Sequence, residues 1–291
     1  MTLPRLTSLI ILGAAALTGA TSKADDTPLT EPVIRPVTSA YTIEGGSSHI
    51  ADTYLTPLRY SGWTTALSYE RMQAMRFDPE RWVMRLTTSF ALEKTDNPSR
   101  NASVWGVDAN VSWGMMRRFH LSSVPSLTLA GGGSAELNIG ALYSTRNGNN
   151  PVSAKASATV NITGYATWNF TLWRLPVTVR YQPTLPVAGA FFSPDYGELY
   201  YEIYLGDTSG LAHAAWWGNY FRLDNLLTAD LHFGGTSLRL GYHGNILSTK
   251  VNDIVTRNIS HCAVVGVTGE WMTLNRRHPI SKEARIISAL Y

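Results

Sequence analysis

Polar and apolar residues alternate along much of the chain with a period of two. Between Ser153 and Leu172 the odd positions are mainly polar, from Lys155 to Thr171, and the even positions are mainly apolar. A period of two belongs to a β-strand, in which neighbouring side chains point to opposite faces. The run is about three times the usual strand length, so it predicts a long strand with one polar and one apolar face.

The same alternation recurs and predicts an antiparallel sheet of about twelve strands. A weaker pattern after residue 205, where 208–210 and 224–226 read as tight turns, leaves ten strands as the other solution. The connections alternate in length, with long loops such as 45–61 and short turns such as 76–81. The predicted strands are 38–44, 62–75, 82–94, 105–115, 126–139, 153–172, 176–182, 200–206, 212–222, 226–233, 237–248 and 254–271.

Strand faces of this length need a covering along their whole extent, either a second sheet or lipid. No apolar run after the first residues approaches the roughly 20 residues of a membrane helix. Short turns alternating with longer loops, and tryptophans near strand ends, are typical of outer-membrane barrels, whose closure pairs every backbone group. We therefore expect an all-β fold, an antiparallel transmembrane β-barrel in the outer membrane of a Gram-negative bacterium. A soluble periplasmic β-protein is one alternative.

The composition agrees with an exported domain that is embedded in a membrane. Charged residues make up 15% of the chain, below the usual share of about a quarter. Residues 1–24 resemble a cleaved signal peptide, with a basic residue before an apolar run and small residues after it. We expect 25–37 to form a flexible periplasmic leader and 38–291 a single barrel domain, in which 272–291 is a tail or the closing strand. Cys262 is the only cysteine, which excludes an intramolecular disulfide.

Charge and metal-ligand spacing exclude further classes of function. Removal of Arg5 and Lys23 with the signal peptide lowers 24 basic residues to 22, against 21 acidic ones, a net charge of +1. A nearly neutral chain without basic clusters is not expected to bind nucleic acid. The histidines lack the spacing of a metal site, so we expect no metal and no cofactor. The expected partners are outer-membrane lipid and the barrel-assembly machinery, with the protein acting as a monomer.

The polar face of the predicted strands carries charges of both signs. In a barrel of about twelve strands, such residues form hydrogen-bonded networks that fill the interior more often than they line a wide channel. We expect a filled lumen or a narrow pore, and a structural, narrow-pore or surface-binding role. The residues predicted to form this lumen network are Glu70, Arg85, Asp108, Glu136, Lys155, Arg180, Glu202, Asp230, His232, Arg239, His243 and Glu270.

The enzymatic alternative is an outer-membrane lipid hydrolase with a Ser/His pair on the lipid-facing wall. By parity Ser248 and His261 both point outward, and a hairpin turn around Asn252 and Asp253 would bring them opposite each other. A histidine beside a serine can activate its hydroxyl as a nucleophile. No third, orienting residue accompanies them, and the plainer interpretation is an interfacial serine and a rim histidine.

Residues 182–206 form a stretch that is rich in aromatic side chains. Its prolines at 183, 186 and 194 predict an end to strand pairing. It would form a long external loop that enters the lumen as a plug, binds a glycan or lipid head group, or packs over the barrel mouth. The candidate binding residues in this loop are Phe191, Phe192, Tyr196, Tyr200 and Tyr201.

Several segments together resemble one protein family. They are TYLTPLRYSGW (53–63), RYQPTLPVAGAFFSPDYGELYYEIYLG (180–206), GLAHAAWWGNYF (210–221), LLTADLHFGGTSLRLGY (226–242) and STKVNDIVTRNISH (248–261). They are similar to an exported family of gut Bacteroidetes, the domain of unknown function numbered 3316, over roughly 38–271. The resemblance implies an outer-membrane barrel and no particular activity, and no catalytic residue is carried over. The tail from Met272 to Tyr291 departs from the family pattern.

Overall fold

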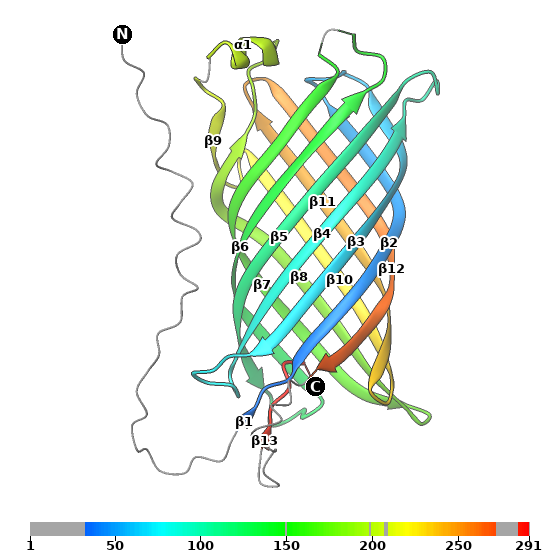
Figure 1. The fold of residues 1–291 in the computed structure, drawn as a ribbon, viewed down its shortest axis with the longest axis vertical. Coiled ribbons are helices and arrows are strands. Elements are labelled where there is room, and N and C mark those ends of the chain that lie inside the picture. The colour runs from blue at the N-terminus through cyan, green and yellow to red at the C-terminus, as the bar shows by residue number, and fades with distance from the viewer. Residues whose placement is uncertain (1–32, 149, 198, 207–208, 272–284, 291) are drawn as a thin grey trace, which may run out of the picture.

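Ten long strands pair edge to edge in the computed structural model, which describes residues 33–148, 150–197, 199–206, 209–271 and 285–290. Consecutive strands are antiparallel, and the ring closes where β8 pairs with β10 and β12 with β2 (Figure 1). The predicted transmembrane-barrel fold is confirmed, with ten strands in the ring. These strands are β2 (Val37–Asp52), β3 (Arg59–Ala74), β4 (Trp82–Asp96), β5 (Ser103–His120), β6 (Leu127–Ser144), β7 (Val152–Leu172), β8 (Leu175–Phe192), β10 (Tyr220–Phe233), β11 (Thr236–Val251) and β12 (Ile254–Trp271).

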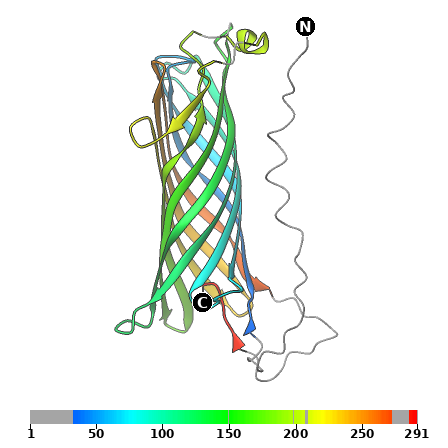
Figure 2. The same cartoon turned by 90° about the vertical axis from the view of Figure 1, so that its left-hand side faces the viewer.

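The remaining elements lie at the two ends of the barrel. The helix α1 (Tyr200–Tyr204) lies at one end, which we call the α1 end, close to β9 (Ala212–Ala215), an extra strand that pairs with β8. At the opposite end, the terminal end, β1 (Val33–Ile34) pairs in parallel with β13 (Arg285–Ile286). Both described chain ends therefore lie at the same mouth of the barrel (Figures 1 and 2).

The alternation within β7 separates the two faces of the wall. Val160 and Ile162 on the outer face are each 59% exposed, whereas Asn161 and Thr163 on the inner face are each 3% exposed. Exposed apolar and buried polar side chains are the reverse of the arrangement in a water-soluble protein. This inversion is what a barrel in hydrocarbon requires, because lipid covers the apolar face and the ring encloses the polar one.

The strands are longer than a bilayer demands. The ten barrel strands contain between 14 and 21 residues each, whereas about 9–11 residues suffice to cross the hydrocarbon core. The extra length replaces loops: β2 extends to Asp52, so the long loop expected at 45–61 is mostly strand. The predicted alternation of long and short connections is wrong for this reason. No helix in the described part of the chain is long and apolar enough to span a bilayer.

Two predicted strands after β8 are wrong, which explains the count of ten. Residues 200–206 contain the helix α1, in which the Leu199 backbone N–H donates to the Glu202 carboxylate at 2.9 Å. The turn expected at 224–226 does not exist, because Asp224 and Leu226 both pair with β8 and with β11. A continuous ladder on both sides outweighs the turn preference of Asp and Asn.

Two of the three prolines that were expected to end strand pairing lie inside β8, whereas Pro194 lies just after it. Pro183 is paired with Asn225 of β10, and Pro186 is paired with Asn161 of β7. The β7–β8 register shifts between Val160 and Asn161, opposite Pro186, and the β8–β10 ladder ends at Thr184. The prolines are thus tolerated because each lies where a ladder is interrupted or about to end.

The closing strand ends at Trp271, which pairs with Val37 of β2. The last described residues form a tail instead: β13 contacts β1, and the following residues enter the terminal end of the barrel. The leader expected at 25–37 is described only from Val33, where it contains β1 and the first residue of β2. The predicted signal peptide at 1–24 lies outside the described residues.

Replacing Ile162 by lysine tests whether hydrocarbon covers the outer face. Ile162 is 59% exposed on β7, so Ile162→Lys would be nearly neutral in water. In a bilayer we expect it to lower the free energy of unfolding by about 2–4 kcal/mol, because a cation near the midplane loses its hydration. Urea unfolding in lipid vesicles measures the change. Tyr204→Lys in α1, at an 83% exposed position, is the matched control, and equal stabilities would contradict a lipid-covered face.

Candidate functional site

A buried carboxylate binds three arginines in the barrel lumen. Glu70 on β3 accepts a hydrogen bond from Arg85 Nε at 2.6 Å through one oxygen. Its other oxygen accepts from Arg180 Nη2 at 2.6 Å and from Arg239 Nη1 at 2.7 Å. Arg180 and Arg239 are each 2% exposed. Three cations around one carboxylate need a second anion, since an uncompensated charge is costly to bury.

Asp230 supplies the second anion of this cluster. Arg239 donates to both Asp230 oxygens, from Nε at 2.7 Å and from Nη2 at 2.8 Å, in bidentate geometry. The cluster joins β3, β4, β8, β10 and β11, so it crosses the lumen from one side of the ring to the other. We call Glu70, Arg85, Arg180, Asp230 and Arg239 the central ion cluster. Its side chains bridge the lumen between these strands.

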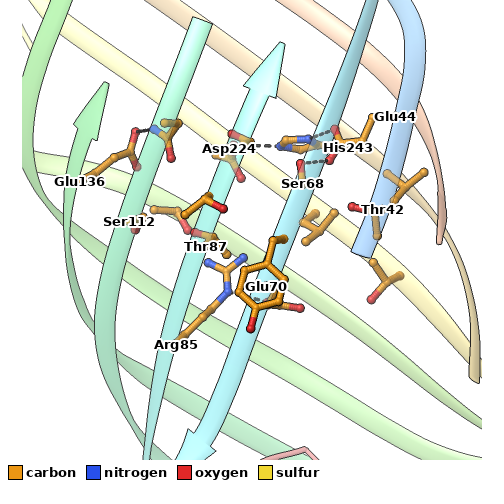
Figure 3. Close-up of a pocket in the computed structure, with 18 of the residues that line it drawn as sticks. Thr42, Glu44, Ser68, Glu70, Arg85, Thr87, Ser112, Glu136, Asp224 and His243 are labelled. Carbon is orange, nitrogen blue, oxygen red and sulfur yellow. Dashed lines mark hydrogen bonds and ion pairs between the residues drawn. The ribbon is translucent and has the colours of Figure 1, made fainter. Parts of the chain in front are cut away.

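A histidine links two carboxylates next to the central ion cluster. His243 contacts Glu44 through Nδ1 at 2.6 Å and Asp224 through Nε2 at 2.9 Å. Ser68 donates to Glu44 at 3.0 Å, and Asn245 donates to Asp224 at 3.1 Å. Figure 3 shows the imidazole of His243 between the two acids, above Glu70 and Arg85. Both ring nitrogens of His243 are therefore occupied by partners.

Further polar groups continue toward the α1 end. Glu136 binds Arg222 and accepts from Asn110 at 2.7 Å and from Asn161 at 3.1 Å. Asp108 accepts from Asn138 at 2.8 Å. In separate contacts, Ser48 and Asn258 donate to Glu93, and Lys155 forms an ion pair with Asp52 at 2.6 Å. Polar side chains therefore occupy the lumen over most of its length.

Two small cavities remain among these side chains. Their volumes are about 100 Å³ and about 150 Å³, and they share Glu44, Ser68, Ser89, Arg222 and His243 in their walls. Pockets that bind drug-sized ligands typically measure roughly 300–1,000 Å³. These spaces suit a few waters or a small polar solute. Figure 3 shows the smaller cavity and its lining.

The carboxyl-terminal tail packs into the terminal end of the lumen. Ala289 is fully buried and Leu290 is 7% exposed, in a cluster with Met72, Val83, Met116, Ala130 and Tyr165. Arg118 anchors this tail by donating to the Ser288 carbonyl at 2.7 Å, and it also donates to the carbonyl of Pro79, between β3 and β4, at 2.5 Å. Backbone carbonyls of the tail and of the β3–β4 connection therefore replace water as partners of a buried guanidinium.

The predicted lumen residues lie on inward-facing strand positions, with one exception. Glu202 lies on α1, outside the ring, where it caps the helix, so its placement in the lumen was wrong. His232 contacts Thr178 and Ser237, and Glu270 contacts Thr38 and Ser288. Sequence reasoning missed the lumen residues Glu44, Arg118, Arg222 and Asp224. Most of them occupy positions an even number of residues from a predicted lumen residue on the same strand, so the alternation could have indicated them.

The Ser248 and His261 side chains are not brought together. In the β11–β12 register Ser248 pairs with Arg257, and His261 pairs with Gly244, four residues away from Ser248. Four residues of strand separate two positions by roughly 13 Å. His261 instead stacks on Tyr242, whose hydroxyl contacts its Nδ1 at 2.5 Å. The predicted juxtaposition was wrong. The two-residue turn at Asn252 and Asp253 sets a register in which the residue opposite Ser248 is Arg257, four positions before His261.

The aromatic candidates fall into two groups. Phe191 is buried and Phe192 half-buried at the end of β8, where Phe191 packs against Tyr220. Tyr200 joins α1 to the barrel rim, since its hydroxyl accepts from the Ala154 N–H at 2.6 Å and its ring contacts Tyr54. Tyr196 and Tyr201 remain exposed, at 68% and 65%. The stretch therefore covers part of the mouth instead of entering the lumen.

No group of metal-ligating side chains with suitable geometry occurs within the described residues. The carboxylates of the lumen are instead held by arginine, histidine, lysine, amide or hydroxyl groups. These contacts organise the lumen as a polar core.

Residues 6–278 match the family described as protein of unknown function (DUF3316). The chain belongs to this family. The match spans the whole ring of strands, in agreement with the resemblance of the sequence motifs, and stops before the tail at 285–290. No curated protein matches the chain.

Solved outer-membrane barrels are similar to this DUF3316 protein in fold. The outer membrane protease OmpT from Escherichia coli has a TM-score of 0.42 and 6% identity, with 81% of this chain and 97% of that chain covered. The translocator domain of the autotransporter NalP from Neisseria meningitidis has a TM-score of 0.38 and 12% identity, with 84% and 90% covered. The β-domain of the Bordetella autotransporter BrkA has a TM-score of 0.37 and 11% identity, with 82% and 100% covered.

Neutralising Glu70 tests the energetic role of the central ion cluster. In Glu70→Gln, Arg180 and Arg239 lose their shared counter-charge while remaining buried, and we expect a loss of about 3–5 kcal/mol in the free energy of unfolding. Glu80→Gln is the control, since Glu80 pairs with Arg285 at an exposed site and its loss is expected to cost less than about 1 kcal/mol. Urea unfolding in detergent micelles compares both. Similar losses in the two variants would contradict a central role.

Proposed function

We propose that this DUF3316 protein is an outer-membrane barrel with a closed lumen and a surface-binding role. The fold supports an outer-membrane location, with the chain termini on the periplasmic side and α1 on the outside, as in barrels of this class. The observation that carries the proposal is the central ion cluster. It joins opposite sides of the ring, and its two most buried arginines are each 2% exposed.

A second closure in series supports a barrel that does not conduct. The tail residues Ala289 and Leu290 are buried at the terminal end. Open aqueous channels are a property of barrels with larger strand numbers. An ion entering this lumen would have to break the Glu70 contacts and displace the tail, and both steps expose buried polar groups.

The exposed tyrosines at the α1 end support the surface-binding role. Tyr196, Tyr201 and Tyr204 are 68%, 65% and 83% exposed, and the rings of Tyr201 and Tyr204 stack at a centroid distance of 6.5 Å. Tyrosine presents an apolar face together with a hydroxyl donor, which suits a sugar ring or a lipid head group. Tyr200 holds α1 on the rim through Ala154, which keeps this aromatic surface in place.

Other aspects of the role follow from the barrel environment. Outer-membrane lipid would cover the apolar wall, and the barrel-assembly machinery would insert the strands. A closed ring leaves no long strand edge that demands a second copy, so we propose a monomer. The lipid-hydrolase alternative loses its support, since Ser248 is paired with Arg257 and not with His261.

Planar-bilayer recording tests the closed lumen. We expect the purified full chain to give no conductance steps under conditions in which a general porin, inserted as a positive control, conducts. The physical reason is that the central ion cluster and the tail block the lumen in series. Discrete steps from the full chain would contradict the proposal, whatever their size.

Binding of soluble polysaccharide, released from lipopolysaccharide by mild acid, tests the aromatic surface. Removing both rings in Tyr201→Ser with Tyr204→Ser is expected to weaken binding about tenfold, since each aromatic contact contributes roughly 0.5–1.5 kcal/mol. Isothermal titration calorimetry measures the affinity. Phe77→Ser removes an aromatic ring that is 66% exposed at the terminal end, and it should leave binding unchanged. Equal affinities for all variants would overturn this surface as the binding site.

A further inference from the structure

The ladder between β8 and β10 stops short of the α1 end. Within the described residues, β8 and β10 pair from Val177 with Leu231 to Thr184 with Asp224, and no further toward the α1 end. Beyond that point β8 continues with β7 and, from Gly189, with β9, while β10 continues with β11. We call the two flanking segments, 185–188 of β8 and 220–223 of β10, the seam.

The seam lies within the lipid-facing belt of the wall. On one side its residues Leu185 and Ala188 pair with Ile162 and Val160 of β7, both of which are 59% exposed on the outer face. On the other side Leu223 pairs with Ile246 of β11. The interruption is therefore flanked by apolar outward positions and faces the leaflet at the α1 end. Figure 2 shows a yellow loop next to β9 that stands out from the wall on this side.

Local contacts satisfy some of the backbone groups at the seam without a strand partner. Pro186 brings no N–H to the edge, and its carbonyl accepts a hydrogen bond from the indole Nε1 of Trp217. The N–H of Tyr220, where β10 begins, donates to the Trp216 carbonyl at 2.8 Å. An edge with these groups satisfied can contact hydrocarbon, whereas an edge with unpaired groups cannot.

Only side chains separate the seam from the lumen. The rings of Phe191 and Tyr220 lie 5.2 Å apart and join β8 to β10 where the ladder is missing, and the Tyr220 hydroxyl contacts Ser157 Oγ at 3.1 Å. Leu247 and Val251 pack against this pair from β11. Tyr220 and Leu247 also line the larger cavity. Phe191, Tyr220 and Leu247 therefore form an apolar contact between the seam and a cavity whose other walls are mainly polar.

We propose that the seam is a lateral opening that admits a single alkyl chain of a membrane amphiphile into the barrel wall. Elsewhere in the ring, an opening of this size would break several backbone pairs in hydrocarbon, at several kcal/mol for each group. At the seam no strand ladder has to separate: the opening breaks the Trp217–Pro186 and Tyr220–Ser157 hydrogen bonds and rotates the Phe191 and Tyr220 rings. The chain would then lie against Phe191, Tyr220 and Leu247.

Photo-crosslinking of the full chain in phosphatidylcholine vesicles tests this opening. The probe is a fatty acid with a diazirine at the end of its alkyl chain, and mass spectrometry identifies the labelled residues. We expect adducts at the inward-facing Tyr220 and Leu247 in addition to outward residues such as Val160. Adducts confined to the outward face would overturn the proposal. So would equal labelling of Val83 at the terminal end, because that pattern indicates entry through a barrel mouth.

Removing the indole donor tests the role of Trp217 in closing the seam. Trp217→Phe keeps an aromatic ring but loses the hydrogen bond to Pro186, so labelling of Tyr220 and Leu247 is expected to rise several-fold. Trp63→Phe is the matched control, since Trp63 is an exposed tryptophan on β3, away from the seam. Unchanged inward labelling in Trp217→Phe, or an equal rise in both variants, would overturn the opening. Neither result bears on polysaccharide binding or on conductance, so the lateral opening and the proposed function are tested independently.

Discussion

Closure of the backbone hydrogen-bond ladder is the constraint on which the rest of the structure depends. In hydrocarbon an unpaired N–H or C=O costs several kcal/mol, so the ten strands must form a ring. A ring has an outer and an inner face, and a sequence that alternates with a period of two makes the outer face apolar and the inner face polar. Residues 160–163 of β7 show this directly, with Val and Ile outside and Asn and Thr inside. Where the β8–β10 ladder stops, the carbonyl of Pro186 accepts a hydrogen bond from the Trp217 indole in place of a strand partner.

Charge pairing in the lumen is a consequence of the same closure. A narrow ring that faces its polar residues inward removes them from bulk water, so each charge needs a partner of opposite sign or hydrogen bonds from neutral groups. Glu70 and Asp230 together compensate buried arginines, and Glu44 and Asp224 share one histidine. These partners come from strands far apart in the sequence. The lumen therefore holds the two halves of the ring together from within.

The period-two pattern predicts the strands and their inward parity because both depend on local sequence. The charge partners depend on the stagger of the closed ring, which local sequence does not contain; Glu70 and Arg239 are 169 residues apart. Asp224 was missed because Asp and Asn favour turns, and ladders on both sides outweighed that preference. Tyr200–Tyr204 is rich in residues that favour strands, but it has no strand neighbour and forms a helix. In both cases the presence or absence of a neighbouring strand outweighed the intrinsic secondary-structure preference of the residues.

The buried tail has a bearing on the order of assembly. Ala289 is enclosed at the terminal end, although it follows β12, the strand whose pairing with β2 completes the ring. Ala289 cannot be buried inside the barrel before the ring has formed, so docking of 285–290 accompanies or follows the last strand pairing. Because the family match stops at residue 278, this late step belongs to sequence outside the shared barrel.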